Sequence, residues 1–474
     1  MKQKLKQPRS EASKVWSGRF DGKTSSLMEE FSSSLPVDRV MWREDLAVNH
    51  AWAGALQRAS LLTSNEQHKI QRALNQIEKE FDREKFVFLP DDEDIHVAIE
   101  RRLTELTGPA GAKIHTGRSR NDQVTTDFRL YLKRQILEMQ NALCEAINAG
   151  VEQAMKNTEI IMPGYTHTQQ AQPLRLSHYL LSLFQVLRRH QRQLVDALDR
   201  LDEMPLGSGA LAGSAFPIDR QRLARELGFS RVAENSVDAT GSRDFCTEIV
   251  FVCVSICITL SRYAGDFILW ASQEFGFLDP GETFATGSSM MPNKKNPDAF
   301  ELIRGKAAEI SGKLSAILSL QKGAPVTYSR DLQEDKRITF EALATAHSCL
   351  MVFAGALASS RFRVDKIGAA LDTAMLATDV ADYLVRKGVP FRDAHRVVGN
   401  AVRHAETIGW KLHELPLAFW QTLSPLFDES IQACFDFEKS VEQRNVIGGT
   451  SHASVLRQLQ AARRWLQQQR KNNT

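Results

Sequence analysis

Polar side chains that can bind anions and move protons gather in five short segments of this 474-residue chain. One of them, Gly287–Asp298, reads GSSMMPNKKNPD and combines hydroxyls, lysine cations and a glycine. The other four are DDEDIH (Asp91–His96), HTGRSRNDQ (His115–Gln123), PGYTHTQQAQP (Pro163–Pro173) and TYSRDLQEDK (Thr327–Lys336). Arginine forks and backbone N–H groups suit planar anions. Together the segments indicate a site for a small substrate that bears several carboxylates.

Each segment taken alone has a simpler explanation. A lone histidine such as His167 is more often a structural hydrogen-bonding group than a catalyst, and arginines such as Arg118 and Arg120 are usually solvated. The segment GSGALA (Gly207–Ala212) matches a dinucleotide-binding pattern, but a charged helical stretch precedes it and no strand follows at the required distance. We therefore predict a glycine-rich turn between helices there.

The composition is that of a soluble globular protein, with 43% hydrophobic and 25% charged residues. A formal net charge of +3 argues against a dedicated nucleic-acid binder. The first residues lack the apolar core of a secretory signal. The most apolar run, Ile249–Leu260, is too short to span a bilayer, so we expect a helix buried on all sides and no membrane partner. These features favour the cytoplasm.

Six cysteines occur in apolar, helical contexts and form no CxxC pair. Cys253 and Cys257 share one helix face, but no further ligands lie nearby at zinc-like spacing. We predict reduced thiols that pack as small core residues, and no metal site.

A helical period dominates the chain, and alternating strand patterns are scarce. Apolar residues recur on one face in three stretches, which hold Ile95/Ile99/Leu103/Leu106, Leu187/Leu194/Leu198/Leu201 and Val455/Leu459/Ala462/Leu466. The acidic residues 91–94 suit a helix start just before the first stripe. Long helices joined by polar, glycine-bearing loops predict an all-α bundle whose loops carry the site.

The segment GSSMMPNKKNP resembles the signature loop of the fumarase/aspartase superfamily, G-S-S-x-M-P-x-K-x-N-P. Within that superfamily the chain resembles the argininosuccinate lyase family. The most specific stretches are HTGRSRND and YSRDLQEDK, and further matches are WSGRF (Trp16–Phe20), DEDIH, PGYTHTQQAQP, LGSGALAG, DYLVRKGVPFRDAH (Asp382–His395) and GGTSHASV (Gly448–Val455). One departure is Asn293, where the family usually has glutamine; the shorter amide bears on rate and not on identity.

The resemblance implies three all-helical domains, with boundaries at 1–119, 120–368 and 369–474. The central domain would contribute long helices to a twenty-helix bundle in a homotetramer, and loops from three subunits would build each site. The implied reaction is cleavage of argininosuccinate into arginine and fumarate, without metal or organic cofactor. Two alternatives stay open. One is a sister lyase that releases fumarate from another N-substituted aspartate, such as adenylosuccinate or an aminopolycarboxylate. The other is a non-catalytic lens crystallin.

The resemblance also assigns catalytic roles. Cleavage removes a proton beside a carboxylate and leaves a doubly negative species, which oriented donors and a cation stabilise. Lys294, Asn296 and the loop N–H groups suit that task, and the glycine lets the loop close. Ser288 aligns with the catalytic serine, the base. His167 aligns with the catalytic histidine, which protonates the leaving guanidinium nitrogen or, in an older reading, is itself the base; Glu301 is its matching carboxylate partner.

Six further positions match the family's substrate contacts, and Arg118 is added as a carboxylate clamp beside one of them. The six are Ser34, Asn121, Thr166, Tyr328, Gln333 and Lys336. Ser34 could instead be an ordinary N-cap within the serine run 32–34. Tyr328 and Gln333 could instead pack at a helix end.

Overall fold

The structure, a computed structural model, describes residues 24–472. The basic start of the chain and the WSGRF motif lie outside the described residues. The described chain is all-α with short strand pairs, as the helical periodicity predicts. It divides into two compact units, which we call unit 1 (described residues 24–131 and 203–240) and unit 2 (132–202 and 241–472). The three-domain boundaries stay a prediction.

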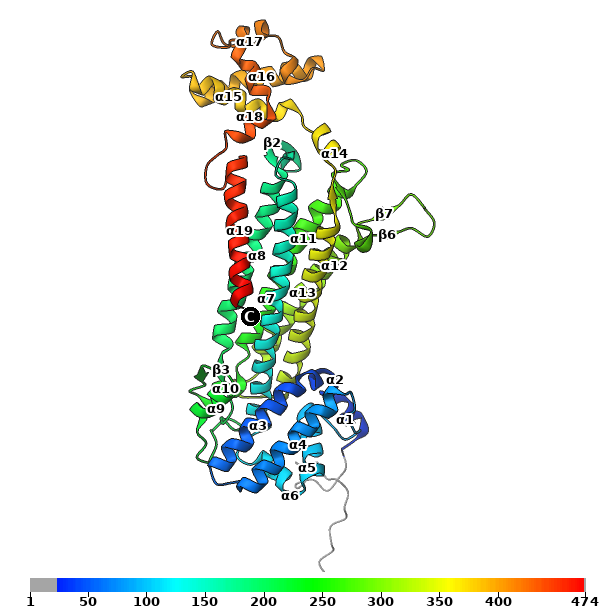
Figure 1. Cartoon of the computed structure of the whole chain (residues 1–474), viewed down its shortest axis with the longest axis vertical. Helices are drawn as coiled ribbons and strands as arrows, with labels where there is room; N and C mark the ends of the chain where they lie inside the picture. The colour runs from blue at the N-terminus through cyan, green and yellow to red at the C-terminus, as the bar shows by residue number, and fades with distance from the viewer. Residues whose placement is uncertain (1–23, 473–474) are drawn as a thin grey trace, which may run out of the picture. The chain divides into compact units, whose positions relative to one another are not determined.

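Unit 1 is a small helical body around one hydrophobic core (Figure 1). Helices α3 (Trp42–Arg58), α4 (Ser64–Asp82) and α5 (Ile95–Thr107) bury Trp52, Leu74 and the stripe Ile95, Ile99 and Leu103. Its other elements are α1 (Ser26–Ser32), α2 (Leu35–Asp38), η2 (Arg39–Met41), α6 (Pro109–Ala112), η3 (Lys113–His115), α9 (Arg220–Glu226), the start of α7 (Arg120–Lys156) and most of α10 (Ser236–Gly241).

Helix α5 begins where the acidic run predicted it. The side chain of Asp94 is the N-cap and accepts the backbone N–H of Val97 at 2.6 Å. This bond satisfies one of the otherwise unpaired amides of the first turn. The acidic segment is therefore a helix start, as well as the place where His96 enters the core.

Unit 2 is built on long helices that run side by side (Figure 1). They are the remainder of α7, α8 (Leu176–Leu201), α11 (Asp244–Ala271), α12 (Asp298–Gly323), α13 (Glu334–Ser359) and α19 (His452–Asn472). The predicted stripe Val455, Leu459, Ala462 and Leu466 is buried along α19, and Leu187, Leu194 and Leu201 are buried along α8. The long helices are thus present as the helical periodicity predicted.

The apolar run Ile249–Leu260 lies within α11, which is longer than the run itself. Most of its side chains are buried, but Phe251 and Ile258 stay 48% and 47% exposed in the single chain. Helix α11 and residues Arg330–Ser359 are long and apolar enough to cross a membrane by composition, with hydropathies of 1.8 and 1.5. Much of each is buried against neighbouring helices, as in core helices of a soluble protein.

All six cysteines are free, as predicted. Cys246, Cys253, Cys257 and Cys349 are buried, whereas Cys144 and Cys434 are partly exposed. Burial raises the pKa of Cys253 to about 12, which keeps that thiol protonated and inert.

The C-terminal part of unit 2 has its own hydrophobic cluster around Leu384, Val398 and Trp420. Its elements are α14 (Val364–Ala369), η6 (Thr373–Leu376), α15 (Ala377–Arg386), α16 (Phe391–Ile408), η7 (Leu412–Glu414), α17 (Leu417–Leu423), η8 (Glu429–Phe435) and α18 (Phe437–Glu442). The buried Arg175 ties this part to the strand Gln169–Arg175 through ion pairs with Glu438 and Glu442.

Four two-stranded pairs interrupt the helices, and two of them carry predicted site residues. The pairs are β1 (Ile161–Thr166) with β2 (Gln169–Arg175), β3 (Glu203–Met204) with β4 (Arg231–Val232), β5 (Leu278–Asp279) with β8 (Arg361–Phe362), and β6 (Thr286–Gly287) with β7 (Lys295–Asn296). Short 3₁₀ turns flank them at η4 (Glu282–Phe284) and η5 (Arg330–Gln333). The segments around His167 and Ser288, which we predicted to be loops between helices, are therefore β-hairpins.

Candidate active site

His167 occupies the tip of the β1–β2 hairpin in a strained backbone conformation. Thr166 pairs with Gln169, so His167 and Thr168 are the two turn residues, with φ of 53° and 59°. Two left-handed residues make a type I′ geometry, which usually takes Asn-Gly. Side chains rarely adopt this region, and such strain clusters at functional sites. The turn holds His167 and Thr166 exposed to solvent.

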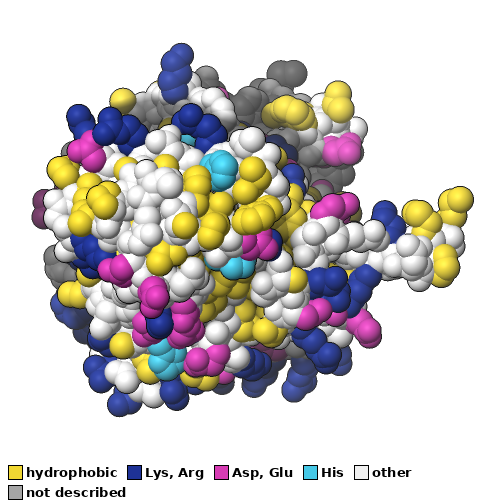
Figure 2. Space-filling model, turned by 90° about the horizontal axis from the view of Figure 1, so that it is seen from above, with side chains coloured by type: hydrophobic (Ala, Val, Ile, Leu, Met, Phe, Trp, Pro, Cys, Tyr) yellow, Lys and Arg dark blue, Asp and Glu magenta, His cyan; other side chains and the backbone are white. Residues whose placement is uncertain are grey.

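Ser288 begins a loop that projects from unit 2 between β6 and β7 (Figure 1). Its Oγ accepts the backbone N–H groups of Met290 and Met291 at 3.2 and 3.0 Å. Donors aimed at this oxygen favour its negatively charged form over the neutral hydroxyl. Figure 2 shows the projecting arm ending in hydrophobic side chains, and Met290 is 87% exposed.

Lys294 and Asn296 complete the signature hairpin. Lys294 is exposed, and its backbone N–H donates to the carbonyl oxygen of Met291 at 3.1 Å. The Asn296 amide lies 3.5 Å from the Thr286 hydroxyl across the strand pair. The hairpin therefore presents the Ser288 hydroxyl, the Lys294 ammonium group and the Asn296 amide together.

Glu301 lies in the first turn of α12 and is exposed. Within residues 24–472, no hydrogen bond or ion pair joins it to His167. The pairing of these two groups stays a prediction, and both side chains are accessible for a partner from another chain.

The segment Thr327–Lys336 of unit 2 carries three predicted site residues on and around η5. Tyr328 and Gln333 are half-buried, whereas Lys336 is buried at the start of α13. The Lys336 ammonium donates to Asp335 at 2.7 Å, and Asp335 also pairs with the buried Arg243. Lys336 is thus held in a fixed place by a buried carboxylate.

Arg118 lies inside unit 1, and part of its guanidinium lacks acceptors. Its Nη2 donates to Asn49 Oδ1 at 2.7 Å. The Nε and Nη1 groups are buried and have no hydrogen-bond partner among the described residues. Burial lowers the pKa of Arg118, although the nearby negative charge of Asp45 acts to raise it. A carboxylate ligand would supply the missing acceptors.

The other two predicted residues of unit 1 lie at element starts. Asn121 is half-buried in the first turn of α7, and its amide lies 3.4 Å from the carbonyl oxygen of Ala210. The hydroxyl of Ser34 donates to Asp38 at 2.5 Å and makes no cap bond to α2. Ser34 thus occupies the N-cap position of α2 without a side-chain cap bond, and its role in substrate binding stays a prediction.

The glycine-rich turn Leu206–Gly213 donates its amides to a protein carboxylate. Asp122 Oδ2 accepts the N–H groups of Gly207 and Gly209 at 2.9 and 2.8 Å, and Oδ1 accepts that of Ser119 at 2.9 Å. The Arg220 side chain donates to the Leu206 carbonyl oxygen from the other side. The turn does not match a dinucleotide loop, because the N–H groups of Gly207 and Gly209 are already bonded to Asp122.

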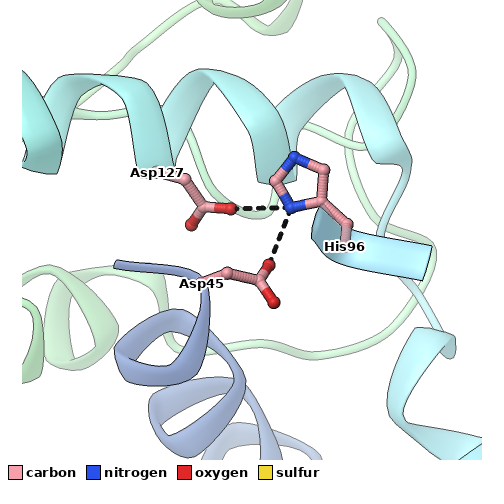
Figure 3. A group of neighbouring side chains, drawn as sticks. All are labelled: Asp45, His96 and Asp127. Carbon is pink, nitrogen blue, oxygen red and sulfur yellow. Dashed lines mark hydrogen bonds and ion pairs between the residues drawn. The ribbon is translucent and has the colours of Figure 1, made fainter. Parts of the chain in front are cut away.

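A buried cluster behind these loops has no counterpart among the predicted site residues. Figure 3 shows the His96 imidazole pointing between the carboxylates of Asp45 and Asp127. Nδ1 lies 2.8 Å from Asp45 Oδ1 and 3.1 Å from Asp127 Oδ2. A weak sequence signal exists: Asp45 and Asn49 share a helical stripe with the buried Trp52 and therefore face the core.

The cluster carries a proton on its histidine. Burial alone would lower the pKa of His96, but the charge of Asp45 and hydrogen bonds to both carboxylates raise it to about 10. Burial raises the pKa of Asp45, yet the His96 charge brings it down to about 2. The imidazole nitrogen and the carboxylate oxygens lie within 4.8 Å of one another. The imidazolium already supplies the positive charge there.

The comparisons with known proteins cover nearly the whole chain. A lyase family model matches residues 18–312, and an argininosuccinate lyase C-terminal model matches residues 374–442. The chain is 45% identical to an argininosuccinate lyase of Chlamydomonas reinhardtii over 467 residues, which are 98% of this chain and 99% of that protein. It is 46% identical to one of Moorella thermoacetica, covering 95% and 97% of the two chains.

Solved structures share the fold. A variant of EDDS lyase with bound fumarate has a TM-score of 0.82 and 25% identity, over 92% of this chain and 88% of that one. A class II fumarase from Schistosoma mansoni has a TM-score of 0.71 and 17% identity, over 84% and 90% of the two chains, which shows the fold alone.

Proposed function

The chain belongs to the argininosuccinate lyase family, and we propose that it acts through the loops at His167, Ser288 and Arg118. The enzyme is a carbon–nitrogen lyase that cleaves argininosuccinate to L-arginine and fumarate in a reversible β-elimination, a step of arginine biosynthesis. The near full-length match to argininosuccinate lyases carries this assignment. The site residues and their roles are our proposal.

We propose that Ser288 removes the proton beside the carboxylate. An ordinary hydroxyl is too weak a base, so its charged form needs stabilisation. The two N–H groups of Met290 and Met291 that point at Oγ support this role. The developing dianion would be stabilised by the Lys294 ammonium and the Asn296 amide, whose placement on one hairpin lets them arrive together.

His167 would protonate the departing guanidinium nitrogen, or assist that transfer. Its exposed position at a rigid hairpin tip supports a role that is completed by groups outside its own loop. Glu301 is the proposed carboxylate partner that keeps the imidazole basic and oriented. The reverse assignment, with His167 as base, predicts that the Ser288 substitution is the milder of the two.

Substrate-binding roles are proposed for residues of each unit, taken separately. The unsatisfied donors of Arg118 support a carboxylate clamp in unit 1, beside Asn121 and Ser34. Thr166, Tyr328, Gln333 and Lys336 would contact the substrate from unit 2. The ammonium of Lys336, fixed by Asp335, is suited to hold an anionic group without moving.

A homotetramer with shared sites accounts for the apolar surface of the long helices. Phe251 and Ile258 on α11 and Leu302 on α12 are exposed in the single chain, and Leu302 is 63% exposed. Exposed apolar faces of this kind mark protein interfaces. We propose that these helices form a twenty-helix bundle, with domains 1–119, 120–368 and 369–474, and that the enzyme is cytoplasmic, which its free thiols suit.

A fumarate-release assay tests the assignment of the substrate. The purified chain is incubated separately with argininosuccinate, adenylosuccinate and an aminopolycarboxylate aspartate derivative, and fumarate absorbance is followed. We expect release from argininosuccinate only. Release from another of the three alone would establish the sister lyase, and no release from any would support a non-catalytic role.

Mixing inactive variants tests the shared sites. His167→Asn and Ser288→Ala chains are each inactive in the proposal, but mixed tetramers would contain some sites with both native groups. We expect activity to reappear after subunit exchange, which labelled chains verify. Exchange without recovered activity would contradict sites that draw on several chains.

A further inference from the structure

His96 has no role in the reaction proposed above, although it is the centre of a buried network in unit 1. We propose that His96 is a positioning residue, whose imidazolium holds Asp45 as a carboxylate and thereby fixes the orientation of Arg118 and Arg120. The proposal rests on the proposed function, in which the loop of these arginines binds the substrate's carboxylates.

Two short chains of hydrogen bonds lead from Asp45 to the arginines. Asp45 Oδ1 accepts the amide of Gln123 at 2.6 Å, and the Gln123 oxygen accepts Arg120 Nη1 at 2.7 Å. Asp45 Oδ2 accepts the amide of Asn49 at 2.8 Å, and the Asn49 oxygen accepts Arg118 Nη2 at 2.7 Å. Each amide thus presents its N–H to Asp45 and its oxygen to an arginine.

The direction of both chains depends on an ionised Asp45. An ionised carboxylate only accepts hydrogen bonds, so both amides must turn their NH₂ groups toward it. A protonated carboxyl would carry a hydrogen on one oxygen, and an amide at which this hydrogen points would have to turn. That amide would then present its NH₂ group, and not its oxygen, to Arg118 or Arg120. Arg118 would lose its acceptor on Asn49, or Arg120 would lose its acceptor on Gln123 and keep its contacts with Glu100 and Asp94.

His96 is the cation that keeps Asp45 ionised in a buried place. Four carboxyl groups face the imidazole from four elements: Asp38 of α2, Asp45 of α3, Asp94 at the start of α5 and Asp127 of α7. Arg118 and Arg120 are further cations that interact with Asp45. Without the imidazolium, burial and the neighbouring carboxylates would both favour a proton on Asp45.

The substitution His96→Gln removes the charge and keeps a hydrogen-bonding side chain. We expect KM for argininosuccinate to rise about tenfold while kcat changes less than threefold, because ground-state carboxylate binding is weakened and the catalytic hairpins are untouched. A purely structural role would instead lower the fraction of folded enzyme, which reduces apparent kcat and leaves KM unchanged. His190→Gln is the matched control: His190 is a largely buried histidine of α8, and burial lowers its pKa.

A second variant keeps His96 and breaks one of the two chains of hydrogen bonds, the one that leads from Asp45 through Gln123 to Arg120. Gln123→Leu removes the link between Asp45 and Arg120, and we expect a KM increase of several-fold. The double variant should raise KM by less than the product of the single effects, because both act through Asp45. Unchanged KM in folded Gln123→Leu, or fully multiplicative effects, would overturn the proposal.

Fumarate affinity, measured by calorimetry on the unaltered chain and both variants, separates this proposal from the proposed function. If the unaltered chain released no fumarate from argininosuccinate, the proposed function would fail. Weaker fumarate binding in His96→Gln would still support the role of His96, and equal binding would contradict it.

Discussion

The carboxylate of Asp122 accepts the backbone N–H of Gly209 at 2.8 Å, although 87 residues separate them in the chain. The bond ties the first turn of α7, which follows the arginine loop, to the glycine-rich turn of unit 1. The N–H of Gly207 makes the same contact. A motif that superficially resembles a phosphate-binding loop is therefore occupied by an internal anion.

Replacing Asp122 should loosen both loops at once. We expect Asp122→Ala to lower the free energy of unfolding by about 2 kcal/mol, since three backbone N–H groups, two of them in buried bonds, lose their acceptor. Chemical denaturation checks this value. Asp219→Ala is the control, because Asp219 caps the short, exposed α9 through one bond and its loss should cost about 1 kcal/mol. An equal loss of unfolding free energy in both variants would contradict the proposal that Asp122 holds the two loops together.

The adjacent residues Ser288 and Ser289 provide a matched pair of substitutions that tests whether Ser288 is the base. Ser288→Ala should lower kcat about 10²–10⁴-fold, the range for loss of a general base. Ser289→Ala removes an exposed hydroxyl from the next position and should change kcat less than about threefold. The fumarate assay measures both. Near-normal turnover in Ser288→Ala would move the base role to His167.

The left-handed turn at His167 allows a substitution that removes the imidazole without breaking the hairpin. Asparagine tolerates positive φ better than most residues, so His167→Asn should keep the fold and lose about 10²-fold or more in kcat. Thr168→Asn, at the other turn position, should retain turnover within a few-fold. If both variants lost activity equally, turn geometry and not the imidazole would be responsible.

Stability should fall with rising pH because of His96. Its pKa is about 10 in the folded chain against 6.5 ordinarily, so the folded state binds a proton that the unfolded state releases. The stabilisation is fully present below pH 6.5 and is lost as pH rises toward 10. The limiting slope is about 1.4 kcal/mol per pH unit for one proton. Denaturation at pH 6.5, 8 and 9 should show a smaller decline in His96→Gln, and identical declines would contradict a buried imidazolium.

Much of the architecture could be predicted from apolar spacing. The stripes of α5 and α19 are buried as expected, and Asp94 caps α5 where the acidic run suggested. The hairpins could not be predicted, because their strands are rich in glutamine, proline and glycine. Those residues disfavour strands in general, and here pairing with a local partner overrides that preference.

The site loops were visible in the sequence because each concentrates polar groups locally. The partners behind them were not, because Asp45 and Asn49 reach His96 and Arg118 only after α3 packs in unit 1. Nothing local distinguishes Asp45 from an exposed helical acid except its position on the stripe of Trp52 and Leu56. Networks of this kind depend on tertiary packing, so motifs reveal the groups that touch ligand sooner than the groups that hold them.

Closure of the projecting hairpin can also be followed by limited proteolysis of the chain. Lys294 and Lys295 stand together on the β6–β7 arm, where trypsin can reach the bond between them. An arm that folds over product would hide this bond, so fumarate with arginine should slow its digestion while cuts elsewhere continue at the same rate. Gel electrophoresis of samples taken over time would then report whether the arm closes over the bound products.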